Sequence, residues 1–298
     1  MTVRTRGDMC GLTVREEQVY GQVDASGTSE YGGTLQTITT NDDETTESQI
    51  QCGSIVQGEP YTVKTSTGFT ATFNHKVGQA WTDWIRRALG ALTGTRNTSP
   101  PFDAEFRVGA DEYHLLTGSR VDSLSIAGSE IGAALVFTVT AVSRWHTMTP
   151  FRDSDGTGIT MPTASVPAGA PLTFNNVWEY STDGSQFNPI KAKAFTLAIN
   201  RALQSEPGIS SEGGYQLEAG SDSAAQSSTI TLELTITSVG PEWDRLRLAL
   251  TKGMTFRTVL DGHTITLTGC ALSPAGPNRT QSSYDETISV TATDMVVS

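Results

Sequence analysis

Apolar and polar residues alternate over short segments along much of the chain. In Ile230–Ile236, for example, Ile and Leu alternate with Thr and Glu. A period of two is that of a β-strand with one buried face. Similar segments predict strands near Thr34–Thr40, Tyr61–His75, Phe106–Val108, Ile131–Val142, Ala192–Ile199 and Thr229–Thr237.

Two segments depart from this alternation and show the spacing of an amphipathic helix. The first runs over Val77–Thr93 and is followed by Gly94, a residue type that commonly ends a helix. Its apolar positions are Trp81, Trp84, Ile85, Ala88, Leu89 and Leu92. Because these residues share one face, packing in a core is favoured for both tryptophans over an aromatic platform for a ligand.

A second, shorter helix is expected over Gly240–Leu250. Pro241 stands at its first helical position and Glu242 in its first turn, as is typical of helix N-termini. Gly253 provides the stop. The apolar face consists of Trp243, Leu246 and Leu250.

The two helices have similar flanks in the same order. Each follows a Val-Gly pair, and each has a tryptophan three residues after that glycine. The matching pairs are Val77-Gly78 with Val239-Gly240, Phe106-Arg107 with Phe256-Arg257, Leu116-Thr117-Gly118 with Leu267-Thr268-Gly269, and Val139-Thr140-Ala141 with Val290-Thr291-Ala292. Chance accounts for a single tripeptide but not for this fixed order, so we expect an internal duplication.

The sequence therefore predicts a mainly β fold. It consists of two tandem β-sandwich or barrel domains, each with one flanking α-helix, related by internal duplication. Between them, Arg144–Pro171 holds four prolines and three glycines, a composition typical of a linker. The expected organisation is an N-terminal arm at 1–33, a first domain at 34–148, a linker at 149–170 and a second domain at 171–298.

The chain has 298 residues and a net charge of −12. The acidity is shared evenly, with 11 basic and 17 acidic residues up to Thr147 and 9 and 15 after it. Without a basic stripe, binding to the nucleic-acid backbone is not expected. We also expect no membrane span, because no apolar run approaches eighteen residues, and no secretory signal, because the N-terminus lacks an apolar core.

No catalytic, cofactor-binding or metal-binding residues are predicted, and no enzyme activity is expected. The four histidines, His75, His114, His146 and His263, lie in no motif for a metal or a nucleophile. Asp153–Gly156 resembles the opening of a calcium loop but lacks the distal glutamate. The acidic stretch Asn41–Glu47 is interpreted as the tip of a long loop between strands, either hydrated or reaching a basic patch on a neighbouring subunit.

The cysteines are three and widely separated: Cys10, Cys52 and Cys270. This spacing argues against a disulfide framework or a zinc knuckle and favours reduced thiols. The glycosylation triplets Asn97–Ser99 and Asn278–Thr280 carry no meaning without secretion.

The pattern resembles the major tail tube proteins of long-tailed bacteriophages, in their duplicated two-domain form. The resemblance covers most of the chain and is best in the second half, in KAKAFTLAIN, STITLELTIT, GPEWDRLRLAL, FRTVLDGHTITLTG and ETISVTATD. The first half differs in its longer stretch between helix and LTG and in the acidic insertion at Asn41–Glu47.

The resemblance implies a structural protein of the virion tail, assembled in the host cytoplasm. Three copies would form a pseudo-hexameric ring, and rings would stack head-to-tail into a hollow tube for DNA passage. The implied partners are tape-measure, tail terminator and baseplate proteins, with DNA passing through the lumen without specific binding, no membrane and no cofactor. A negative lining would repel phosphates. The N-terminal arm and Asn41–Glu47 are candidate contacts between rings.

Two other interpretations stay open. A distal tail or baseplate hub protein of related fold would form one ring and stop. A β-sandwich binding module or an enzyme is also compatible with an all-β scaffold. It is less favoured because the sequence shows no convergent polar set, and most of its aromatic residues, 7% of the chain, are needed in the cores.

Overall fold

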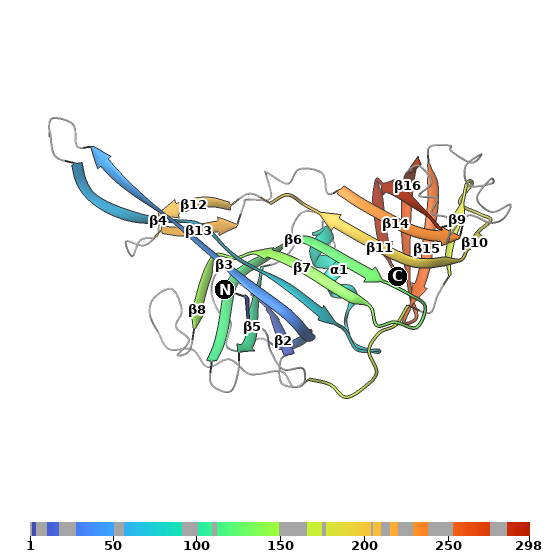
Figure 1. Ribbon diagram of the computed structural model, residues 1–298, viewed down its shortest axis with the longest axis horizontal. Coiled ribbons are helices and arrows are strands. Elements are labelled where there is room, and N and C mark those ends of the chain that lie inside the picture. Colours follow the sequence, from blue (N-terminus) through green and yellow to red (C-terminus); the bar gives the residue numbers. More distant parts are fainter. Residues whose placement is uncertain are drawn as a thin grey trace.

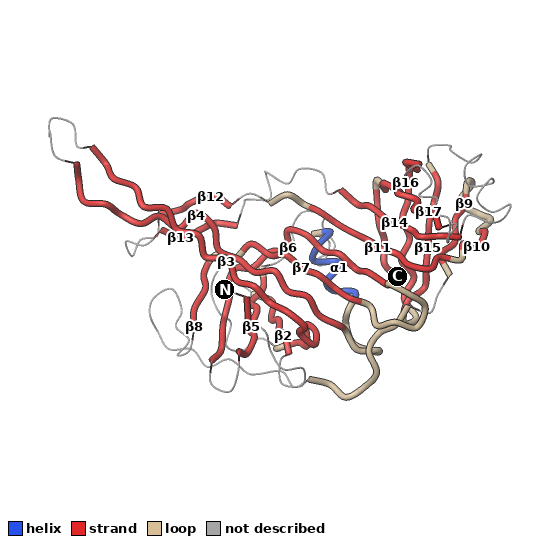
Figure 2. Tube along the Cα trace, viewed as in Figure 1, coloured by secondary structure: helices blue, strands red, loops and turns tan. Residues whose placement is uncertain are grey.

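The computed structural model describes residues 2–3, 11–17, 28–50, 57–90, 101–108, 112–148, 166–174, 177–203, 205–209, 215–219, 229–237, 253–274 and 285–298. Strands dominate this part of the chain, which contains one helix (Figures 1 and 2). The predicted mainly β class is confirmed. Buried residues of both halves form one continuous hydrophobic core.

The first half of the chain closes into a barrel. Its six strands are β2 (Gly11–Glu16), β3 (Glu30–Ile50), β4 (Gln57–Asn74), β5 (Phe102–Val108), β6 (Glu112–Gly128) and β7 (Val136–Val142). They pair in the closed order β2-β3-β4-β7-β6-β5, and β5 returns to β2. Every ladder is antiparallel, as the short alternating segments favour.

Strand β6 is long because it bends and uses both of its halves. Its first half pairs with β5 and with β8 (Trp145–Met148), and its second half pairs with β7. The bend lies at Gly118, whose φ of 62° is in the left-handed region that favours glycine. The bent strand lets one segment serve two parts of the sheet.

Helix α1 (Thr82–Leu89) packs against the barrel and is shorter than the predicted Val77–Thr93. It ends at Gly90, which has a left-handed φ of 67° and donates its N–H to the carbonyls of Arg86 and Arg87. Trp84 packs against Phe73 and Phe102, with ring centroids 5.4 and 5.9 Å away. The core role predicted for the tryptophans is therefore confirmed for Trp81 and Trp84, both buried.

The second half contains β9 (Trp178–Ser181), β10 (Asn188–Ile190), β11 (Ala192–Asn200), β12 (Ser205–Ile209), β13 (Tyr215–Ala219), β14 (Thr229–Thr237), β15 (Met254–Leu260), β16 (His263–Pro274), β17 (Asp285–Ala292) and β18 (Asp294–Val297). Strands pair in the order β9-β15-β16-β17-β14-β11. This order matches β2-β5-β6-β7-β4-β3 strand for strand. The counterpart of the closing β2–β3 pair, between β9 and β11, is absent from the described pairings, and β9 pairs with β10 instead.

The bend of β6 recurs in β16. Gly269 has the same φ of 62° as Gly118, and β18 pairs with the first half of β16 as β8 does with β6. The Ser119 hydroxyl donates to the Leu116 carbonyl at 3.3 Å, and the Cys270 thiol donates to the Leu267 carbonyl at 3.4 Å. These matching details favour the duplication inferred from the sequence.

Three expectations need correction or fall outside the described residues. Residues 11–16, expected in an N-terminal arm, form barrel strand β2, with Leu12 and Val14 buried. The stretch Asn41–Glu47 is not a loop tip, because its backbone continues β3 and pairs with β4. The second predicted helix, Gly240–Leu250, lies outside the described residues, as do 149–165 of the expected linker.

Candidate assembly interface

The two halves are joined by a strand pair. The second half of β6 pairs on its outer edge with β11, over six residue pairs from Phe195–Gly128 to Asn200–Ser123. One sheet therefore runs without interruption from the first barrel into the second half of the chain (Figure 1). The β6–β11 pairing thus shows, within one chain, how the first half joins the second through a shared sheet.

Apolar side chains fill this junction. Ile126 faces Leu197 and Leu124 faces Ile199, and each of the four is at most 1% exposed. Burial of one such side chain contributes about 1.5–3 kcal/mol. Gly128 opposes Phe195, and a β-carbon there would lie 2.7 Å from the Phe195 ring and 2.9 Å from Phe174. The close packing fixes the register of the two strands.

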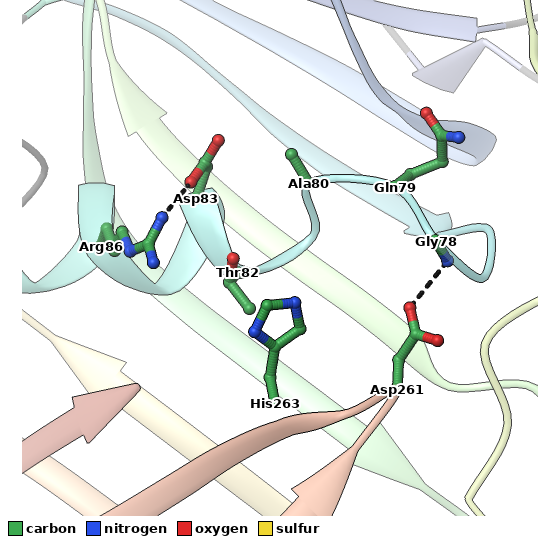
Figure 3. Close-up of a pocket in the computed structure, with 8 residues that line it drawn as sticks. All are labelled: Gly78, Gln79, Ala80, Thr82, Asp83, Arg86, Asp261 and His263. Carbon is green, nitrogen blue, oxygen red and sulfur yellow. Dashed lines mark hydrogen bonds and ion pairs between the residues drawn. The ribbon is translucent and has the colours of Figure 1, made fainter. Parts of the chain in front are cut away.

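A second contact joins the segment before α1 to the turn between β15 and β16 (Figure 3). The Gly78 N–H donates to the Asp261 carboxylate at 2.7 Å, and the His263 ring lies edge-on to Trp81 at 5.8 Å. Asp261 and Gly262 have φ of 50° and 80°, as in the tight hairpin turn that an Asp-Gly pair favours.

A surface pocket of about 390 Å³ lies at this contact. The Arg86 guanidinium there is already paired with Asp83 at 2.9 Å. Asp261 is held by the Gly78 N–H (Figure 3). The charged groups are thus already paired, Arg86 within α1 and Asp261 across the two halves, and we assign the pocket no ligand. Its lining is Gly78, Gln79, Ala80, Thr82, Asp83, Arg86, Asp261 and His263.

Within the part of the chain that the structure describes, the strand that corresponds to β6 has an unpaired edge at the equivalent place. In the second half of β16, Ala271–Pro274 pairs with β17 on one side. Within the described residues, no strand pairs with its other side. That side is the counterpart of the β6 edge on which β11 docks. A vacant strand edge presents backbone donors and acceptors to a further strand.

The matching partner for this edge is found by following the register through each half. Val139 pairs with Ala71, which pairs with Ile38 of β3. In the second half, the equivalent path from Val290 reaches Leu197 of β11 through Leu232. Ile38 therefore stands in β3 where Leu197 stands in β11.

The same comparison of strand pairings identifies which residue of β16 is equivalent to a given residue of β6. Val139 pairs with Leu124, and Val290 pairs with Leu272, so Leu272 is the counterpart of Leu124. Leu124 faces Ile199, which lies two residues after Leu197, as Thr40 lies two residues after Ile38. A copy of the junction between two chains would thus set Leu272 of one opposite Thr40 of the other.

A long hairpin extends from the first barrel beyond the body of the molecule (Figure 1). It is formed by β3 and β4, which stay paired from Thr34–Asn74 out to Ile50–Gln57. The short hairpin β12–β13, inserted between β11 and β14, lies beside it. Both hairpins connect equivalent strands of the two halves, and together they form an arm suited to reach a neighbouring molecule.

The four histidines weighed as candidate sites lie in three separate places, with only His114 and His146 in contact. His75 is buried, its ring Nδ1 lies 3.4 Å from the Lys76 carbonyl oxygen, and burial lowers its pKa. His114 and His146 stack on each other with a ring nitrogen contact of 2.9 Å, and His114 also stacks on Phe106. His263 takes part in the contact before α1. Among the described residues, no three His, Cys, Asp or Glu side chains gather as for a metal ion.

Cys270 is buried in the core, and this burial raises the pKa of its thiol to about 11. A thiol with so high a pKa is a poor nucleophile at neutral pH. Cys10, Cys52, Asp153–Gly156 and both glycosylation triplets lie outside the described residues. The described helix is too short and too polar to cross a membrane.

The junction between the two halves was not predicted from the sequence. A strand was predicted at β11, but the residues of β6 were noted only for the matched Leu116-Thr117-Gly118 motif. The two strands share no motif and lie about seventy residues apart, so nothing in the sequence pairs them. The available signal was the pair of matched LTG motifs, which mark the two strands that bend. No protein-family model matches the sequence, and no curated protein matches it.

Proposed function

We propose that this protein is a non-catalytic structural subunit that assembles with copies of itself into rings, which stack into the hollow tail tube of a bacteriophage. The observation that carries the proposal is the β6–β11 junction together with its two counterparts: an edge of β16 that is unpaired within the described residues, and an edge of β3 on which only the two residues of β1 pair. Within one chain, the first half joins the second half through the β6–β11 strand pair. The equivalent edges of β16 and β3 could form the same kind of pair between two chains.

A junction of this kind is heterologous, because it joins different surfaces of the two partners. Repetition of a heterologous contact gives a ring where the rotation closes and an open filament where it does not. Two units in each chain, in a ring of six units, correspond to three chains. The number six comes from the resemblance to tail tube proteins, and the heterologous contact is compatible with it.

The extended β3–β4 hairpin and the charge support the stacking of rings. An arm that projects from a ring is placed to reach the next ring (Figure 1). A net charge of −12 suits the wall of a DNA conduit, because a negative surface offers phosphates no cations to bind. The tape-measure, terminator and baseplate proteins would be its neighbours at the ends and in the lumen.

The second candidate is a distal tail or baseplate hub protein, which would use the same ring junction without stacking. The β6–β11 junction favours both candidates equally. The projecting hairpin favours the tube, since a protein that stops at one ring has less need of an arm. A binding module or an enzyme is supported by no convergent polar site among the described residues.

Electron microscopy of the purified full chain over a range of concentrations tests the proposal. We expect extended tubes with a regular axial repeat and a central channel. Discrete single rings would instead favour the distal tail or baseplate hub protein over the tube protein. Monomers at every concentration, with no ring or tube, would overturn assembly as the function. A binding module would then be the favoured interpretation.

A further inference from the structure

The edge of β3 that assembly would use is already occupied within the chain. Strand β1 (Thr2–Val3) pairs with β3 on the side away from β4, with Thr2 opposite Thr39 and Val3 opposite Ile38. The register derived above sets Ser273 and Pro274 of a second copy opposite those same two residues of β3. A strand edge forms hydrogen bonds with one partner at a time.

From this overlap we propose that β1 is an intramolecular cover, which must leave β3 before β16 of a second copy can dock there. The proposal rests on the proposed function and adds to it a step that regulates assembly. In the free chain, β1 covers the outer edge of β3 at Ile38 and Thr39. In the assembly, β16 of the neighbour would cover that edge instead.

The second half of the chain shows the state without a cover. There, β11 is paired with β14 on one side and with β6 on the other, so its outer edge carries the neighbouring unit along six residue pairs. In β3 the equivalent edge carries a strand of only two residues. A short strand holds weakly, which suits a segment that is to be displaced.

β1 covers only part of this edge of β3, so the incoming strand can begin to pair at the residues of β3 next to β1. Thr40 and Asn41 pair with β4 but, among the described residues, with nothing on the side of β1. Leu272 and Ala271 of the second copy are the residues that the register sets opposite them. Docking would begin at these two residues and then displace β1 from Thr39 and Ile38. Pro274 lacks an N–H and limits how far the new ladder is fully bonded.

A reversible covalent lock tests this step. Thr2→Cys and Thr39→Cys stand opposite each other in the β1–β3 pair, within the range that a disulfide spans. The background carries Cys10→Ser and Cys52→Ser, so that Cys270, which is buried, is the remaining native thiol. Light scattering follows assembly, and electron microscopy identifies the product.

The oxidised lock is expected to stop assembly or to lengthen its lag at least tenfold, and a reducing agent is expected to restore it. Each single cysteine variant, treated with the same oxidant, controls for effects of oxidation. A chain that lacks residues 2–3 should instead shorten the lag, because one or two net hydrogen bonds correspond to about tenfold in the fraction of uncovered edges.

Equal assembly of the oxidised and reduced lock would overturn the role of β1 and leave the proposed function intact. Loss of assembly on removal of residues 2–3, in a chain that still folds by circular dichroism, would also overturn it, since β1 would then be a required contact. Failure of the unlocked background chain to assemble, together with failure of the native chain, would overturn the proposed function and this inference together.

Discussion

His75 is a buried base whose protonation opposes folding. It follows β4 and lies between the rings of Tyr31 and Phe137, with centroids 5.3 and 6.0 Å away. Burial lowers its pKa below the ordinary histidine value of 6.5. As the pH falls below this value, the unfolded chain binds a proton at this position while the folded chain does not. The free energy of unfolding should therefore decrease with falling pH in that window.

Replacement by an aromatic residue that does not titrate isolates this effect. We expect His75→Phe to retain the packing against Tyr31 and Phe137 and to lose less stability than the native chain between about pH 7.5 and pH 5.5. Urea unfolding at both pH values measures the difference. The difference in the free energy of unfolding between the two chains cancels the contribution of carboxylates that titrate in both. An equal decrease in stability in the two chains would show that His75 is not the group responsible.

The burial of His75 also shows why single residues are hard to place from sequence. Its neighbours in the chain end a strand, which suggests exposure. Segment 171–174 lies against it, where the Leu172 N–H donates to the His75 carbonyl at 2.8 Å and Pro171 bridges to Lys76. That segment is almost a hundred residues away, in a region whose composition indicates a linker. No local pattern signals such a cover.

The bends of β6 and β16 each place a glycine at a φ of 62°, and Gly269 is closely packed. A β-carbon on Gly269 would lie 2.0 Å from the Thr293 hydroxyl and 3.1 Å from its β-carbon. Thr293 lies just before β18 and donates its N–H to the Thr268 carbonyl at 3.1 Å. The return of the chain from β17 to β18 is thus packed against this glycine.

We expect Gly269→Ala to lower the free energy of unfolding by about 2–4 kcal/mol, from a left-handed backbone together with the collision. Gly262→Ala is the matched control, because Gly262 also has a positive φ, of 80°, but a β-carbon placed there would meet nothing within 4 Å. It should lose only about 1–2 kcal/mol. Chemical denaturation compares them. The addition of Thr293→Ala should recover the collision part, and equal losses at the two glycines would contradict the argument.

At the scale of elements, the alternation predicted β11 and β14 closely but did not predict β2 or β6. The first helix was predicted to begin at Val77, five residues before its observed start at Thr82. Gly78 takes a positive φ of 73° and the Val77 N–H bonds to the Ala170 carbonyl, which together hold this segment out of a helix. The error at Asn41–Glu47 has another cause. A two-stranded hairpin is held by its backbone ladder, so it needs no alternation of apolar residues.

At the scale of the whole molecule, the sequence indicated two similar halves but not how they meet. Matched motifs report that Leu116–Gly118 and Leu267–Gly269 are equivalent. They do not report that β6 carries β11 on its outer edge, while no described strand pairs with the corresponding edge of β16. This difference is visible only when the register of every strand pair is known.

The register itself gives the sharpest test of assembly. Ala271 of one copy should oppose Asn41 of the next, and both are exposed in the single chain. Opposed residues in an antiparallel pair have α-carbons about 4.5–5.5 Å apart, which a disulfide spans. In a background with Cys10→Ser and Cys52→Ser, Asn41→Cys with Ala271→Cys should therefore form disulfides between copies under assembly conditions. Non-reducing gels should show a ladder that ends at three chains.

Two further cysteine pairs serve as a positive and a negative control for this cross-link. Ser123→Cys with Asn200→Cys copies the same contact within one chain, since Ser123 faces Asn200 across the β6–β11 junction. It should form its disulfide without a change in covalent mass, which establishes that the chemistry works at this geometry. Gln36→Cys with Ala271→Cys moves one partner five residues along β3, about 16 Å away, and should not cross-link. Equal cross-linking at positions 36 and 41, or none at either in assembled protein, would show that β3 and β16 do not meet in this register. The rings would then have to close through surfaces other than the repeat of the internal junction.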